Sequence, residues 1–285
     1  MTKNKALRNT VNVQGRTLLD YSPMNNRYFD GLLHRLAGIC APEKWCFDST
    51  NGLPVLKNLL TLNFMRIDEE DSLLPAQGKS PKLQQYYDGN IRRECFNTGL
   101  CTPDGIKLYA VSRPHPSPSY QDRMLLDDFI PADKLSRDYG VDTSKDDKAD
   151  FLTDKLSVNT DLKIVPNYDH ITGDNLSRWP LPFQAKSKDE LTEILDDRIE
   201  RTKRELKDNP QNAAMYYYRP NAYIEGRIQL LLPLKIEGEA VDMALALERK
   251  RGFLYAVTCL KREWAYSNAR VLGRPQADWL DPSTM

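Results

Sequence analysis

A set of amide, hydroxyl, imidazole and guanidinium side chains in this sequence has the chemistry needed to bind a nucleotide or a short stretch of RNA. Arginine donates paired hydrogen bonds to phosphate, tyrosine stacks on bases, and amides hydrogen-bond to base or ribose edges. Several of these residues stand where strand or helix propensity disfavours them, so we expect them to converge in one polar cleft. The set comprises Asn97, Thr98, His170, Asn175, Arg178, Gln229, Tyr266, Asn268 and Arg270.

Two kinds of ligand chemistry follow from this set. In the favoured interpretation the protein binds a nucleotide or single-stranded RNA, with Arg178 and Arg270 holding phosphate and Tyr266 stacking on a base. The alternative is a metal-independent phosphodiesterase or nucleotide hydrolase, in which His170 is the general acid or base and Arg178 stabilises the oxyanion. The sequence contains no P-loop and no carboxylate cluster typical of a two-metal site, and we expect no cofactor and no metal.

Each polar group also has a structural interpretation, and a third possibility is an interaction protein in which all of them are structural. Asn97 and Thr98 precede a glycine inside a strand pattern, where glycine often marks a bulge. His170 and Asn175 could simply tie down an irregular loop. Tyr266 and Arg270, four residues apart, would share one face of any helix.

Charge and composition restrict the class of protein. Forty basic residues balance forty acidic ones, so no global field attracts nucleic acid and any such site must be a local patch. No apolar stretch approaches the roughly 20 residues that span a bilayer, and the N-terminus lacks a signal-peptide core. The five cysteines are odd in number and sparse, which favours free thiols in a reducing cytoplasm over a disulfide scaffold. We therefore expect a cytoplasmic protein without membrane contact; the oligomeric state stays open.

The hydrophobic pattern predicts an α+β fold. Three short apolar or alternating runs, joined by glycine-containing connectors, predict an antiparallel meander at 227–235, 241–248 and 253–260. A Pro-Asp-Gly turn predicts a hairpin between 94–101 and 106–113. Apolar residues at helical spacing predict three main helices at 25–39, 54–67 and 187–207, the second ending near an acidic run and the third beginning with a capping box. The expected architecture is one antiparallel sheet of about five strands, containing the meander and flanked by these helices.

The domain boundaries follow from the same pattern. Residues 1–22 form a polar N-terminal arm, and residues 23–285 form a single α+β domain. A charged segment near 136–159 has few large apolar side chains, so we expect a flexible and dispensable surface insertion.

Short phrases spread over most of the chain resemble a known family. They are FNTGL at 96–100, QLLLPL at 229–234 and YSNAR at 266–270, with Asn167, His170, Asn175 and Arg178 between the first two. Together they resemble the family called domain of unknown function 3825. Some of its members are fused to cold-shock or other RNA-binding modules. The resemblance therefore implies a function connected with RNA but does not identify a reaction. The sequence departs from the family pattern at 259–263, where a threonine and an aspartate are usual.

Overall fold

The computed structural model describes residues 26–47, 52–73, 81–116, 124–145, 147–151, 161–219 and 226–285. The chain forms two compact units. The first comprises Met1–Phe151 with Arg219–Gly226, and the second comprises Leu152–Tyr218 with Arg227–Met285. The expected N-terminal arm lies outside the described residues, and the folding of both units as a single domain stays a prediction. Within the described part of the chain, no helix is long and apolar enough to cross a membrane.

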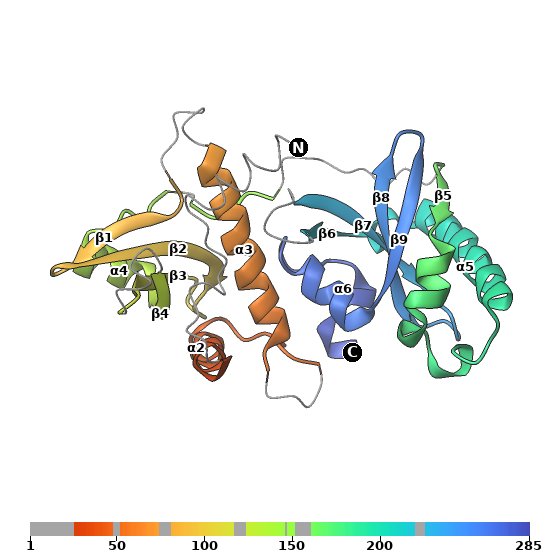
Figure 1. Cartoon of the computed structure of the whole chain (residues 1–285), viewed down its shortest axis with the longest axis horizontal. Helices are drawn as coiled ribbons and strands as arrows, with labels where there is room; N and C mark the ends of the chain where they lie inside the picture. Colours follow the sequence, from red (N-terminus) through yellow and green to blue (C-terminus); the bar gives the residue numbers. More distant parts are fainter. Residues whose placement is uncertain are drawn as a thin grey trace. The chain divides into compact units, whose positions relative to one another are not determined.

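The first unit contains a four-stranded antiparallel sheet with strand order β1-β2-β3-β4 (Figure 1). Its strands are β1 (Gln84–Asp88), β2 (Ile91–Cys101), β3 (Lys107–Pro114) and β4 (Met124–Pro131). Its helices are α2 (Asn26–Ile39), α3 (Pro54–Leu73) and α4 (Ala132–Tyr139). The predicted hairpin is β2–β3, and Gly105 in its turn has a φ of 81°, a conformation that glycine adopts without steric cost.

Helix α3 continues through the acidic run near which the sequence predicts its end. Arg66 forms ion pairs with Glu69 at 3.2 Å and Glu70 at 2.8 Å, one turn further along the helix. The Asp71 carboxylate accepts hydrogen bonds from the backbone N–H groups of Lys82 and Leu83, both at 2.8 Å. The carboxylates are therefore used as acceptors, and their unfavourable position near the helix C-terminus is offset by these local donors.

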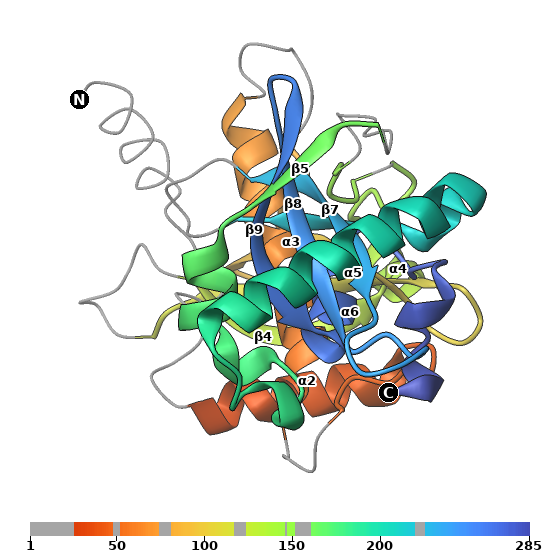
Figure 2. The same cartoon turned by 90° about the vertical axis from the view of Figure 1, so that its right-hand side faces the viewer.

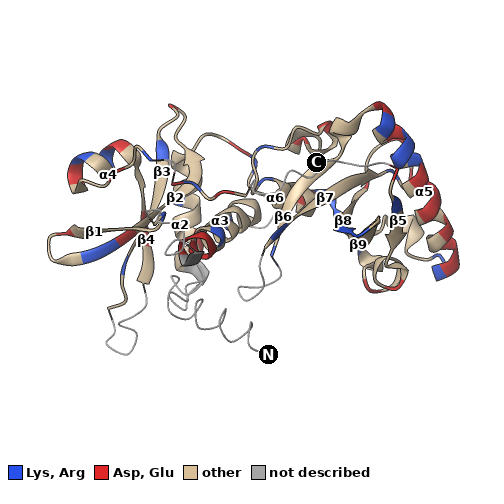
Figure 3. Cartoon of the chain, turned by 90° about the horizontal axis from the view of Figure 1, so that it is seen from above, with Lys and Arg blue, Asp and Glu red and all other residues tan. Residues whose placement is uncertain are grey.

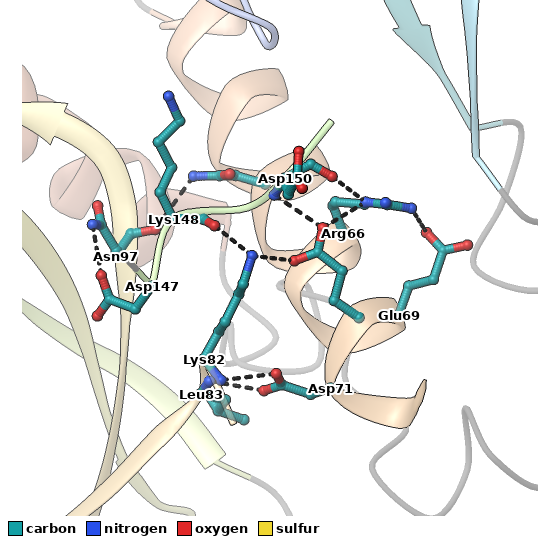
Figure 4. A network of polar contacts seen from close by, with 11 residues as sticks. Arg66, Glu69, Asp71, Lys82, Leu83, Asn97, Asp147, Lys148 and Asp150 are labelled. Atoms are coloured by element: carbon teal, nitrogen blue, oxygen red, sulfur yellow. Dashed lines mark hydrogen bonds and ion pairs between the residues drawn. The ribbon is translucent and has the colours of Figure 1, made fainter. Parts of the chain in front are cut away.

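The described part of the 136–159 segment packs into the first unit, which differs from the flexible insertion expected from its composition. Asp147 is only 4% exposed, and Ala149 and Phe151 are buried with it. The backbone oxygens of Lys148 and Asp150 accept hydrogen bonds at 2.7 Å from a lysine before β1 and an arginine on α3, as Figure 4 shows. A few small or aromatic side chains and a hydrogen-bonded backbone thus anchor a segment that is mostly polar in composition.

The second unit contains a five-stranded mixed sheet with strand order β5-β9-β8-β7-β6, so the described residues form two sheets in place of the single sheet expected. Its strands are β5 (Lys163–Pro166), β6 (Ala214–Tyr218), β7 (Arg227–Leu234), β8 (Met243–Lys250) and β9 (Phe253–Lys261). Strands β7, β8 and β9 form the predicted meander. Strand β5 pairs with β9 in parallel, which a local sequence pattern does not reveal.

A helix covers each face of this sheet. Helix α5 (Lys188–Asp208) lies along one face (Figure 2), where the leucines of β7 and β8 pack against Leu191, Leu195 and Ile199. Its predicted capping box is present, with Ser187 and Glu190 as the reciprocal pair. Helix α6 (Arg262–Ala269) packs on the opposite face against β6, β8 and β9. The small side chains of Ala244 and Ala246 on that face are fully buried and permit this close approach.

Candidate functional site

The candidate site in the second unit is built on the loop that follows β5. Because β5 is parallel to β9, the chain leaves β5 beside the middle of β9, and the backbone N–H of Asn167 continues the pairing with the carbonyl of Ala256 at 3.0 Å. The loop then forms a π-helical turn, Asp169–Asp174. The carbonyl of His170 accepts from both the backbone N–H and the side-chain Nδ2 of Asn175, at 3.0 and 2.8 Å. Such turns recur at functional sites because they redirect side chains within a short segment.

The hydroxyl of Thr258, on β9, joins two of the predicted site residues. Its Oγ1 accepts hydrogen bonds from Asn175 Nδ2 at 3.1 Å and from Arg178 Nη1 at 2.9 Å. Arg178 Nη1 also donates to the backbone carbonyl of Cys259 at 2.6 Å. The loop, and with it the guanidinium group, is thereby fixed to the strand. Burial raises the pKa of the Cys259 thiol to about 11, although the neighbouring guanidinium favours the thiolate.

Arg178 also lies over an exposed aromatic ring. Its guanidinium carbon is 5.2 Å from the ring centroid of Trp264, within the range of a cation–π contact. Trp264 lies in the first turn of α6 and remains 48% exposed, which is unusual for a side chain of this size. The result is a half-exposed indole that contacts a cation and is partly open to solvent.

His170 lies at the surface of the same loop and has a carboxylate partner. Its Nδ1 is 3.0 Å from Asp174 Oδ2, and the imidazole is 39% exposed. A carboxylate on one ring nitrogen orients the imidazole and leaves Nε2 as the nitrogen available to a ligand.

Asn97 and Thr98 belong to the first unit, where their polar groups are buried and used internally. Asn97 Oδ1 accepts from the backbone N–H of Gly99 at 2.9 Å, and Thr98 Oγ1 donates to the carbonyl of Leu108 at 2.7 Å. Gly99 has a φ of 73°, and the β2–β3 register shifts here. These contacts stabilise a bulge, which is the structural interpretation of the FNTGL phrase. Asn97 Nδ2 is directed to Asp147 (Figure 4).

The remaining predicted residues lie on or near α6. Gln229 is on the face of the five-stranded sheet that α6 covers, Tyr266 and Asn268 are on α6, and Arg270 directly follows it. Gln229, on β7, is buried, and its Oε1 accepts from the hydroxyl of Tyr216 on β6. Among the described residues its Nε2 has no hydrogen-bond partner. Tyr266 and Arg270 are buried and Asn268 is half-buried.

The structure brings only part of the predicted set together. His170, Asn175 and Arg178 share one loop and are connected through backbone or side-chain hydrogen bonds, whereas Asn97 and Thr98 lie in the other unit. The residues that organise this loop beside the predicted ones are Thr258, Trp264 and Asp174. Thr258 could not be singled out from its position in a strand, because its partners come from about 80 residues earlier in the sequence.

The fold and the site define an α+β protein with a polar, partly exposed loop fixed to a mixed sheet, and comparison with known proteins assigns its family. Residues 36–279 match the model of DUF3825, a domain of unknown function, so the chain belongs to that family. Comparison with curated proteins finds no match, and comparison with solved structures finds none either.

Proposed function

We propose that the second unit binds a nucleotide or single-stranded RNA at the surface formed by Trp264, Arg178 and the 167–179 loop. The half-exposed indole of Trp264, held beside the guanidinium of Arg178, is the observation that carries the proposal. An exposed aromatic ring gives a base a stacking surface, and an adjacent cation attracts phosphate. His170, exposed on the same loop, adds an imidazole as a further hydrogen-bonding group.

The positions of the other groups refine their roles in this proposal. Asn175 and Thr258 act through Arg178, because their hydrogen bonds fix the loop that carries it. Arg178 Nη1 is occupied by protein oxygens, so the ligand would meet the remaining edge of the guanidinium group. A fixed guanidinium loses little side-chain entropy on binding, which favours affinity.

Fluorescence titration tests this proposal, because Trp264 is the exposed tryptophan of the second unit, whereas Trp179 and Trp279 are buried. Adding nucleotides or short single-stranded RNA should quench part of the emission, and Trp264→Leu should remove both the quenching and most of the affinity. Leu181→Ala is a matched control, because Leu181 is 80% exposed in the same unit and has no polar role. Binding that is unchanged in Trp264→Leu would contradict the proposal.

The second candidate function is hydrolysis of a phosphodiester or nucleotide, and the His170–Asp174 pair favours it. An imidazole oriented by a carboxylate can accept or donate a proton at its other nitrogen. In that reaction Arg178 would stabilise charge on the phosphate oxygens. Binding requires only the surface formed by Trp264 and Arg178, whereas hydrolysis also requires His170 to transfer a proton, so binding without turnover is the simpler proposal.

A further inference from the structure

A row of basic and aromatic side chains crosses one end of the five-stranded sheet. Residues directly opposite each other on paired strands share a face of the sheet. The register places Lys163 of β5 opposite Phe253 of β9, and Phe253 opposite Lys250 of β8. Toward the other edge of the sheet, Arg227 of β7 lies opposite Tyr218 of β6.

One carboxylate joins the two halves of this row. Glu248 Oε1 lies 3.0 Å from Arg227 Nη1 and 2.8 Å from Lys250 Nζ. The guanidinium of Arg227 lies over the ring of Tyr218, at 5.7 Å from its centroid. The row therefore runs across all five strands on one face of the sheet. Helix α6 covers the other end of the same face. We call this set the sheet-end row: Lys163, Phe253, Lys250, Arg227 and Tyr218.

Further cations lie at the turn between β8 and β9. Arg249 and Arg251 flank Lys250, all three are exposed, and neither arginine has an ion-pair partner among the described residues. Figure 1 shows this hairpin extending past the neighbouring strands, with β5 beginning beside it. Figure 3 shows Lys and Arg on β5 and β8–β9 at this end.

The local charge is strongly positive although the whole chain is neutral. On the described part of this face and in the adjoining turn, four cations, Lys163, Arg227, Lys250 and Arg251, accompany the carboxylate of Glu248, whereas Arg249 alternates to the opposite face. The exposed Asp161 near the start of β5 pairs with Lys207 on α5, at 3.4 Å. An excess of cations over a short surface attracts a polyanion, and a neutral overall charge limits that attraction to this patch.

From this arrangement we infer that the sheet-end row, with Arg251 in the adjoining turn, binds the backbone and bases of a single-stranded nucleic acid. The cations would contact successive phosphates, and the half-buried rings of Tyr218 and Phe253 would stack on bases. Flat, strand-borne aromatics interleaved with cations favour this partner over an anionic membrane, which needs an apolar face that inserts. The inference rests on the proposed function for the class of ligand and extends it from a mononucleotide to a polymer.

The two surfaces lie at opposite ends of one strand, which relates them geometrically. Strand β9 begins at Phe253 and ends at Lys261, immediately before the helix that carries Trp264. Nine residues of strand span roughly 27–30 Å. A mononucleotide is too short to reach both surfaces, so the sheet-end row should affect binding of oligonucleotides and not of mononucleotides.

The test measures the affinity of the full chain for a short single-stranded RNA as a function of salt. In Arg251→Gln the slope of log K against log salt should fall by about 0.7 if the variant no longer neutralises one phosphate. Phe253→Leu should weaken oligonucleotide binding roughly 5- to 150-fold at fixed salt, the value of one stacked base, and Phe253→Tyr should retain it. Arg204→Gln/Lys134→Gln removes two exposed cations elsewhere and should leave the slope unchanged.

The outcomes separate this inference from the proposed function. An unchanged slope in the turn variant, or an equal fall in the control pair, would overturn the inference. Mononucleotide binding that needs Trp264, combined with such a result, would leave the proposed function standing. Oligonucleotide binding that depends on the turn but not on Trp264 would support the inference and contradict the proposed function. Wild-type protein that binds phosphatidylserine vesicles and not RNA would overturn the inference in favour of a membrane surface.

Discussion

Asn97 Nδ2 donates a hydrogen bond of 2.9 Å to Asp147 Oδ1, although 50 residues of sequence separate the two. The same carboxylate accepts from Gln84 Nε2 at 3.0 Å, so one buried side chain connects β1, β2 and the segment after α4. A residue expected to bind a ligand and a segment expected to be dispensable thus stabilise each other inside the first unit.

Asp147→Ala should lower the free energy of unfolding by about 1–3 kcal/mol, because it leaves the buried Asn97 amide without its acceptor. Thermal or urea unfolding measures this change. Asp142→Ala is a matched control in the same segment, where the carboxylate is exposed and hydrogen-bonds locally to Ser144. Equal stability of the two variants would show that the segment is as dispensable as its composition predicts.

Thr258→Val should destabilise the second unit by about 1.5–3 kcal/mol, because one of the lost hydrogen bonds involves a charged guanidinium. Valine has nearly the same shape as threonine, so packing is retained and the hydroxyl alone is tested. Thr258→Ser keeps the hydroxyl and should retain most of the stability. Urea denaturation of the three proteins distinguishes the cases; identical midpoints for threonine and valine would refute a role for Oγ1.

Arg178→Ala should weaken binding of nucleotides or single-stranded RNA by about 1.5–3 kcal/mol, the value of hydrogen bonds to a charged group. Arg178→Lys should recover only part of this loss, because a point charge does not reproduce the planar donor fork. Calorimetric titration provides the affinities. An alanine variant that folds normally and binds as tightly as the wild type would contradict the prediction.

Arg270→Ala is also expected to weaken binding, and its burial adds a second effect. The Arg270 side chain belongs to a residue that is only 8% exposed. Removing a buried guanidinium leaves its protein partners unsatisfied and creates a cavity, so the melting temperature should fall as well. Affinity and melting temperature must therefore be measured together; a loss of affinity at unchanged melting temperature would place Arg270 at the ligand directly.

His170→Gln and Asp174→Asn separate a binding protein from a hydrolase. If the protein only binds, both variants should change the affinity modestly and no product should form with any variant or with the wild type. If it hydrolyses its ligand, His170→Gln should abolish turnover and leave the ligand bound, because the proton-transfer group is lost. Chromatography of the incubated RNA or nucleotide detects the product, and its formation by the wild type would favour the hydrolase.

The cysteines should differ in reactivity, because all five are free thiols in different surroundings. Burial raises the pKa of Cys95 to about 12 and that of Cys259 to about 11, so both are uncharged near neutral pH. Cys46 and Cys101 are only half-buried and should react first with a thiol reagent. Mass spectrometry of the partly labelled native protein identifies the sites. Early labelling of Cys95 or Cys259 would show local opening of the sheets.

Local patterns in the sequence determined several individual elements of this protein. The meander, the β2–β3 hairpin and the capped helix α5 follow from alternation, turn residues and a capping box, whose physical causes act within a few residues. The FNTGL phrase left a bulge and a binding role both open, and its inner glycine has the positive φ that a bulge requires. Motif phrases along most of the chain indicated the family.

Only the tertiary structure decided how these elements combine. In the part of the chain that the structure describes, two sheets form where one was expected, because strand partners and the parallel β5–β9 pairing depend on contacts between distant segments. The same reason explains the site: Thr258 meets Asn175 and Arg178 across about 80 residues, and Asn97 turns inward to Asp147. The sheet-end row is invisible in the sequence because its members come from five strands, and only strand register places them on one face.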